Sequence, residues 1–118
     1  MIKDSLQSLI LELRAFSKER DWDQFHSPKN LSMALATETG ELMEHFQWIT
    51  ETESQNIEDS KKVEVSFEMA DILLYLVRMA DMLEIDLIEA SHQKMAVNHK
   101  KYPIALSKGK HQKYTELK

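Results

Sequence analysis

The sequence contains no cysteine among its 118 residues. This absence excludes disulfide frameworks, thiolate nucleophiles and zinc sites built from cysteine, and it suits a protein of the reducing cytoplasm. Glycine and proline are also scarce, with two of each. An all-β fold of many short strands needs frequent turn residues, so this scarcity favours helices. We therefore expect an all-α, cytoplasmic protein.

Long apolar runs are also lacking, and the first residues carry Asp4 and Glu12 among their apolar neighbours. This pattern differs from that of a signal peptide or a membrane span, so we expect a soluble protein with no membrane contact. Hydrophobic residues make up 42% of the chain and charged residues 30%. That is enough apolar material for a core, and the length favours a single folded domain.

Charge is unevenly spread along the chain, whose formal net charge is −5. Residues 98 to 118 hold six lysines and one glutamate, which leaves nine basic and 19 acidic residues in the remainder. An acidic body argues against binding of polymeric nucleic acid, because duplex affinity depends on neutralising several phosphates. We expect a domain over residues 1 to 103 and a basic polar tail over residues 104 to 118. The tail is either a solvated terminus or, in its first residues, a phosphate contact.

Apolar spacing and capping residues predict four helices. Near the start, apolar residues recur at spacings of three and four, which places on one helical stripe Leu6, Leu9, Ile10, Leu13 and Phe16. Ser27 followed by Pro28 is typical of an N-cap with proline in the first turn, and Asp86 is a second candidate cap. The predicted helices cover about residues 4 to 20, 28 to 48, 61 to 83 and 87 to 101, with a polar loop over 50 to 60 that has room for a helical turn. They predict a four-helix bundle.

The third predicted helix is too apolar for a solvated surface. Residues 70 to 80 are apolar on nearly every side, broken only by Asp71 and Arg78. A chain of this size buries about two-thirds of its surface on folding, which leaves such a helix partly uncovered. We therefore expect a homo-oligomer, a dimer or a tetramer.

Two pairs of acidic residues stand at helical spacing. Glu38 and Glu41 share one face of the second helix, and Glu68 and Asp71 repeat that geometry on the third. Four converging carboxylates repel one another unless a cation lies among them, and a ligand set made of oxygen selects a hard ion. Magnesium is the expected ion, with manganese as a possible substitute, and magnesium also coordinates substrate phosphates.

Spacing alone leaves a second interpretation open, in which these acids line solvated helix faces. A chain with 20 acidic residues contains several such pairs by chance. The metal site is favoured because Glu68 and Asp71 interrupt an otherwise apolar helix, where an unpaired charge is costly.

Several segments also resemble one known family. Glu38-Thr-Gly-Glu41, followed after 26 residues by Glu68-Met-Ala-Asp71, resembles the E-x-x-E and E-x-x-D signature of the MazG-like all-α pyrophosphohydrolases. Three further segments resemble the dCTP pyrophosphatase-like branch of that family: Arg20-Asp-Trp22-Asp-Gln-Phe25-His26-Ser-Pro-Lys29-Asn30-Leu31, His45-Phe46-Gln47-Trp48 and Lys94-Met-Ala-Val-Asn98-His-Lys-Lys101-Tyr102-Pro103. The resemblance covers about residues 5 to 103. One departure is Gly40, where relatives often carry alanine.

The resemblance implies magnesium-dependent hydrolysis of a nucleoside triphosphate between its α and β phosphates. The products would be the monophosphate and pyrophosphate, and the role would be housecleaning of the nucleotide pool. The implied substrate is dCTP or a modified pyrimidine deoxynucleotide. The catalytic and metal-binding residues would be the four carboxylates Glu38, Glu41, Glu68 and Asp71, one glutamate of which could act as the general base.

Phosphate contacts are expected from Lys94, Asn98 and Lys101, which share one face of the fourth helix, and from Lys29. Tyr75 and Tyr102 are further candidates for a hydroxyl near the site.

Aromatic residues flank the second helix and offer flat faces to a nucleotide base. We assign Trp22, His26 and Trp48 to a base pocket and Phe25 to the core. His45 is assigned to structure or surface.

Two other functions remain possible on the sequence. A ferritin-like di-metal protein needs two E-x-x-H pairs, whereas the chain has one, Glu89-Ala-Ser-His92. A non-catalytic helical oligomerisation module would leave the carboxylates in solvent and use the third helix as a dimer seam.

Overall fold

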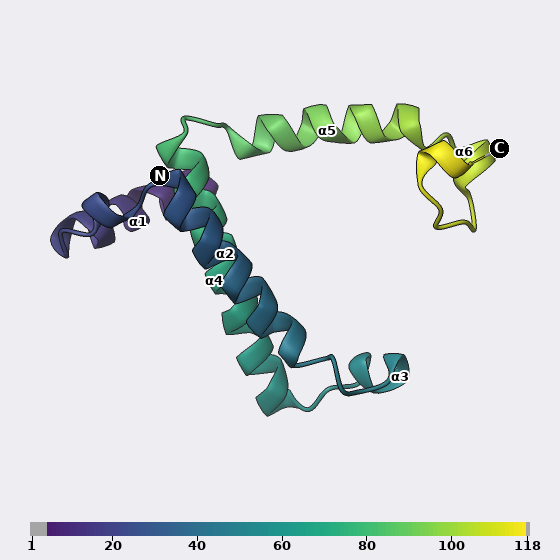
Figure 1. Ribbon diagram of the computed structural model, residues 1–118, viewed down its shortest axis with the longest axis horizontal. Helices are drawn as coiled ribbons and strands as arrows, with labels where there is room; N and C mark the ends of the chain where they lie inside the picture. The colour runs from purple at the N-terminus through teal and green to yellow at the C-terminus, as the bar shows by residue number, and fades with distance from the viewer. Residues whose placement is uncertain (1–4, 118) are drawn as a thin grey trace. The chain divides into compact units, whose positions relative to one another are not determined.

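The computed structural model describes residues 5 to 117, and every regular element in that range is helical. Four longer helices are accompanied in this range by short helices and 3-10 turns (Figure 1). The elements are α1 (Leu6–Glu19), η1 (Asp23–Phe25), α2 (Pro28–Glu44), α3 (Glu51–Ser54), α4 (Asp59–Met82), α5 (Leu87–Lys101), α6 (Ile104–Ser107) and η2 (Tyr114–Glu116). The predicted all-α class and all four predicted helices are confirmed, whereas the four-helix bundle stays a prediction.

Side-chain caps fix where α2 and α5 begin. The hydroxyl of Ser27 accepts a hydrogen bond from the amide of Asn30 at 3.1 Å, and Pro28 occupies the first turn of α2 as predicted. Asp86 caps α5 in the same way, through the amide of Glu89 at 3.0 Å. Each cap satisfies an amide that has no partner inside its helix. The sequence therefore set these two starts correctly.

Helix α2 ends earlier than the sequence predicted. It stops at Glu44, and the residues up to Trp48 form turns. The amides of Phe46 and Gln47 both bond to the carbonyl of Met43, at 2.9 and 3.0 Å, which tightens the end of the helix. A capping box at Thr50 then starts the short helix α3 inside the predicted loop.

Contacts divide the chain into two units, one ending at Glu84 and one beginning at Ile85. In the first unit, α2 and α4 run side by side along most of their lengths (Figure 1). Helix α1 contacts α4, and Arg14 pairs with Asp81 through two hydrogen bonds of 2.6 and 2.8 Å. The buried apolar residues all belong to α2 and α4: Leu31, Val65, Val77 and Ala80.

Many large apolar side chains of the first unit are exposed. On α2 and α4 these include Met33, Met43, Val63, Phe67, Met69, Leu73 and Leu76. Phe25 is 59% exposed, so its assignment to the core is wrong for this chain. It lies at the end of the turn η1 and not on a helix face that packs. Gly40 on α2 is also open, because a Cβ added there would meet nothing within 4 Å in the described chain.

The second unit contains α5, α6 and η2. The amino group of Lys101 lies 4.7 Å from the centre of the Tyr114 ring, and Tyr102 contacts the same ring edge to face. The segment after Pro103 thus contains a short helix and a turn, where the sequence predicted a polar tail. The predicted domain boundary at residue 103 stays a prediction. No helix in residues 5 to 117 is long and apolar enough to cross a membrane.

Candidate functional site

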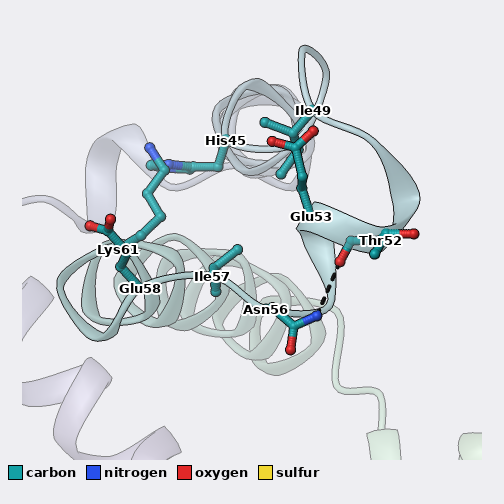
Figure 2. A pocket seen from close by; sticks show the side chains of 8 residues that line it. All are labelled: His45, Ile49, Thr52, Glu53, Asn56, Ile57, Glu58 and Lys61. Atoms are coloured by element: carbon teal, nitrogen blue, oxygen red, sulfur yellow. Dashed lines mark hydrogen bonds between the residues drawn. The ribbon is translucent and has the colours of Figure 1, made fainter.

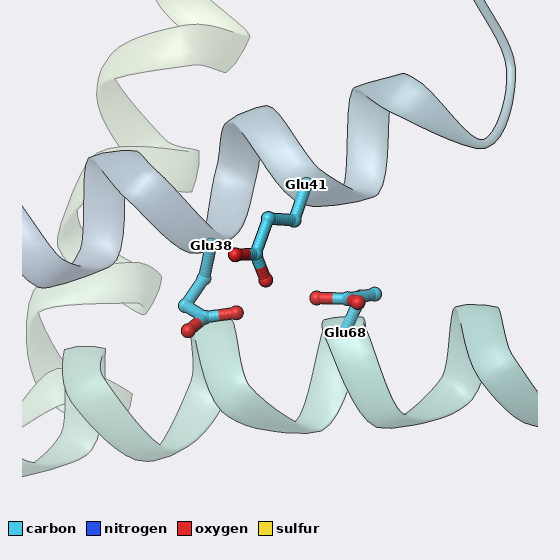
Figure 3. Close-up of side chains that lie close together, drawn as sticks. All are labelled: Glu38, Glu41 and Glu68. Atoms are coloured by element: carbon cyan, nitrogen blue, oxygen red, sulfur yellow. The ribbon is translucent and has the colours of Figure 1, made fainter.

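Three of the four predicted carboxylates converge between the paired helices. Glu38 and Glu41 extend from α2 toward Glu68 on α4 (Figure 3). One carboxylate oxygen from each lies within 4.8 Å of the others. Asp71 is exposed one turn further along α4, outside this triplet, but its charge still acts on Glu38. We call Glu38, Glu41 and Glu68 the carboxylate triplet.

The triplet is electrostatically unfavourable as it stands. Burial and the nearby carboxyl groups of Glu41, Asp71 and Glu68 raise the pKa of Glu38 to about 7. The Oε2 atoms of Glu38 and Glu68 are buried, and neither has a hydrogen-bond partner in the described part of the chain. A buried carboxylate oxygen without a partner is costly. The triplet therefore has the character of a site that takes up a proton or a cation.

The donor atoms of the triplet define which cation would fit. All are carboxylate oxygens, which favour magnesium or manganese over softer metals. His45 also lies beside the triplet, with its Nε2 atom 3.7 Å from Oε1 of Glu68. The sequence assigned His45 to structure or surface and gave no sign of this proximity.

A cavity of about 260 Å³ lies between α1, α4 and the residues that flank η1. It brings together two predicted base-pocket residues, Trp22 and His26, with Asp71. Trp22 packs edge to face on His26, with ring centres 6.3 Å apart. The complete lining consists of Leu13, Phe16, Ser17, Trp22, His26, Asp71, Leu74, Tyr75 and Arg78. The cavity therefore joins an aromatic wall to a carboxylate of the predicted site.

The predicted candidate Tyr75 is linked both to this cavity and, electrostatically, to the triplet. It lines the cavity, and burial together with the charges of Glu38, Asp71 and Glu41 raises the pKa of its hydroxyl. The phenol therefore stays protonated at neutral pH and can donate a hydrogen bond.

A polar network lines the same cavity. Arg78 donates from Nε to Nδ1 of His26 at 3.3 Å and from Nη2 to Oδ1 of Asp23 at 2.7 Å. The hydroxyl of Ser17 donates to that Asp23 oxygen at 2.8 Å and lies 3.1 Å from Nδ1 of His26. Both Arg78 and Ser17 are buried. Sequence reasoning missed this network, although it had noted that Arg78 interrupts an apolar helix.

Other predicted site residues lie elsewhere in the first unit. Trp48 is 86% exposed beyond the end of α2 and does not line this cavity. Lys29 is exposed in the first turn of α2. Their proposed contacts with substrate stay predictions.

The remaining predicted residues belong to the second unit. Lys94, Asn98 and Lys101 lie on α5, and Tyr102 is its C-cap. Asn98 and Lys101 are half-buried, whereas Lys94 is exposed. Their spacing places the three α5 residues on one helix face, as predicted. Their contact with phosphate also stays a prediction.

A larger cavity of about 570 Å³ lies where the chain turns from α2 to α4 (Figure 2). The side-chain amide of Asn56 donates to the backbone carbonyl of Thr52 at 3.3 Å along its wall. Its lining is His45, Ile49, Thr52, Glu53, Asn56, Ile57, Glu58 and Lys61, none of which was a predicted site residue. Its carboxylates do not join the group of three that could hold a metal.

Comparisons with known proteins point to the same family that the sequence motifs resemble. A model of the MazG-like family matches residues 33 to 117. The chain is 44% identical over 104 residues to dCTP pyrophosphatase 1 of Mus musculus and 43% identical to that of Homo sapiens. Each match covers 86% of this chain and 61% of the relative, so the chain spans about three-fifths of the length of these curated relatives.

A solved structure is also similar. It is a pyrophosphatase from Archaeoglobus fulgidus, with a TM-score of 0.79 and 41% sequence identity. The match covers 82% of this chain and 91% of that chain.

Proposed function

Because the chain belongs to the MazG-like family, we propose that it hydrolyses a nucleoside triphosphate to the monophosphate and pyrophosphate. The observation that carries the proposal is the carboxylate triplet, whose oxygens converge within 4.8 Å between α2 and α4. The names of the relatives, dCTP pyrophosphatase 1, support dCTP or a modified pyrimidine deoxynucleotide as the substrate. The cellular role would be cytoplasmic housecleaning of the nucleotide pool.

The proposed cofactor is magnesium, with manganese as a substitute. Glu38, Glu41, Glu68 and Asp71 would hold it, and the two partnerless buried oxygens in the triplet support this assignment. When bound, the ion would offset the negative charge of the phosphates and promote deprotonation of the attacking water. A positive charge among the carboxylates would also return the pKa of Glu38 toward its ordinary range.

The protein's own groups would bind and orient the nucleotide. The cavity beside Asp71 would take the base, with Trp22 and His26 among the residues that contact it. Its volume of about 260 Å³ lies just below the usual range for small-molecule pockets, which favours a one-ring base. The residues proposed to contact base or phosphates from elsewhere are Trp48, Lys29, Lys94, Asn98, Lys101 and Tyr102.

The proposal includes a homo-oligomer, a dimer or a tetramer. Exposed side chains on α2 and α4 support it, among them Met33, Phe67 and Met69, each more than half exposed. Apolar surface of this extent is covered in most stable proteins by a partner. A second copy would complete the helical bundle that the sequence predicted.

The deciding experiment offers the protein dCTP, dTTP, dUTP, dATP and CTP, with magnesium and with a chelator. We expect pyrophosphate and dCMP from dCTP, with magnesium required and with the lowest kcat/KM for dATP. Release of inorganic phosphate and dCDP would mean that the bond between the β and γ phosphates is cleaved, which would contradict the proposal. Absence of turnover together with absence of magnesium-linked stabilisation would favour the non-catalytic oligomerisation module.

A further inference from the structure

The guanidinium of Arg78 fixes which nitrogen of His26 can carry a proton. Arginine has N–H donors and no acceptor, so Nδ1 of His26 must receive the hydrogen bond from Arg78 Nε with a lone pair. The hydroxyl of Ser17 lies 3.1 Å from the same nitrogen, and it can donate its one hydrogen either to Nδ1 or to Asp23. A proton on Nδ1 would oppose the N–H of Arg78. The neutral ring therefore carries its proton on Nε2.

The charge of the ring is fixed by the same surroundings. Burial lowers the pKa of His26, and the positive charge of Arg78 lowers it further, while Asp23 acts in the opposite direction. The ring is consequently neutral at physiological pH. Its one remaining polar atom is an N–H donor.

The arginine itself is held from several sides. Its Nη2 atom bonds to Asp23, and its Nη1 atom lies 3.6 Å from Asp81 on the next turn of α4. Asp81 is in turn bound by Arg14 from α1. The carboxylates of Asp23 and Asp81 together compensate the charge of the buried Arg78. The bonds from Arg78 to Asp23 and to His26, neither of which involves Arg14, hold the guanidinium against the ring.

We propose that Arg78 is a positioning residue that holds His26 as the neutral Nε2–H tautomer, so that the ring donates a hydrogen bond to an acceptor atom of the bound base. This inference rests on the proposed function, because it places the base in the cavity that His26 lines. The acceptor is a carbonyl oxygen or a ring nitrogen. The exocyclic amino group of cytosine is a donor and is recognised elsewhere.

The tautomer can be measured without any substrate. Long-range ¹H–¹⁵N NMR distinguishes the two neutral tautomers and the imidazolium, and a His26→Gln variant assigns the signal among the five histidines of the chain. We expect the Nε2–H form in the unmodified protein. An Nδ1–H tautomer or an imidazolium at neutral pH would overturn the proposal, and this measurement does not depend on any Arg78 variant folding.

A matched pair of variants tests the link to binding. Arg78→Met and Arg14→Met each remove one arginine beside Asp81, but Arg14 bonds to Asp81 and not to His26. With Arg78→Met we expect a mixed His26 tautomer and a KM for dCTP raised about five- to tenfold, the effect of one hydrogen bond, with kcat changed less than about twofold. Arg14→Met should leave the tautomer and KM unchanged. An unchanged tautomer in Arg78→Met, or equal KM values in the two variants, would refute the role.

Failure of the proposed function gives a different result. If the protein hydrolysed no nucleotide, no KM could be measured for any variant, whereas the His26 tautomer would still be measurable by NMR. If it hydrolysed dCTP but His26 kept its tautomer without Arg78, the function would stand and the positioning role would fall.

Discussion

At the scale of single residues, Glu38 shows the sharpest conflict between charge and burial. Its carboxyl group has a pKa raised to about 7, and its Oε2 atom has no partner in the described residues. A carboxyl whose pKa is higher in the folded than in the unfolded state stabilises the fold when protonated. That contribution is lost as pH rises through the folded pKa. The metal-free protein should therefore be less stable at pH 8 than at pH 5.

Glu38→Gln should remove this loss, because an amide carries no charge at either pH. We expect the metal-free variant to have a higher Tm than the unmodified protein at pH 8 and a similar Tm at pH 5, measured by thermal unfolding with a chelator. Turnover should fall by orders of magnitude at both pH values. Glu44→Gln is the control, because Glu44 lies exposed on the same helix outside the triplet. Parallel pH profiles for Glu38→Gln and the unmodified protein would argue against the burial of a repelled carboxyl.

Asp71 tests whether the fourth carboxylate belongs to the metal site. It is exposed and lies outside the triplet, yet it lines the cavity assigned to the base. Asp71→Asn should lower turnover by orders of magnitude while the far-ultraviolet circular dichroism and Tm stay close to those of the unmodified protein. Calorimetric titration should also show weaker magnesium binding. Near-native turnover in this variant would remove Asp71 from the catalytic set.

At the scale of helices, most helix boundaries could be predicted from residues close to them in the sequence. The caps at Ser27 and Asp86 and the stop before Pro103 were all readable from neighbouring residues, because each depends on groups three or four positions apart. The end of α2 could not be predicted in this way, because the hydrogen-bonded turns after Glu44 compete closely with a further turn of helix. The triplet was predictable from two short motifs, whereas the contacts of Arg78 join residues more than 50 positions apart and leave no local pattern.

The cap of α2 can be tested directly, since this helix carries two members of the triplet. Ser27→Ala removes the acceptor for the amide of Asn30 and should lower the free energy of unfolding by about 1 kcal/mol. Ser32→Ala is the control, because the Ser32 hydroxyl bonds to the carbonyl of Lys29 within the helix. Urea unfolding of both variants measures the difference. Equal stability of the two would mean that the cap contributes nothing beyond helix propensity.

At the scale of the whole molecule, many large apolar side chains of the first unit are exposed. Among the residues that the structure describes, four apolar residues are buried, and the large exposed apolar residues on α2 and α4 outnumber them. Light scattering should therefore give a mass at least twice the 13.8 kDa of one chain at micromolar concentration. A mass near that of a single chain would contradict the oligomer.

A charged substitution should locate the contact between copies. Phe67 is 68% exposed on α4, and Phe67→Glu should shift the protein toward the monomer because an interface rarely tolerates a buried unpaired charge. Ile104→Glu is the matched control, since Ile104 is 81% exposed in the second unit. Unchanged assembly in Phe67→Glu would place the interface on another part of the chain.

Gly40 offers a route to a more heat-resistant form of the protein. It lies on α2 between two members of the triplet, in a conformation that any residue adopts, and an added methyl group would meet no atom within 4 Å in the described chain. Gly40→Ala should raise the free energy of unfolding by about 1 kcal/mol, because alanine loses less backbone entropy in a helix. Thermal unfolding measures this gain. If the variant instead loses stability and assembles poorly, the added methyl group must clash with another chain that packs closely on Gly40. The glycine should then be kept in any engineered form.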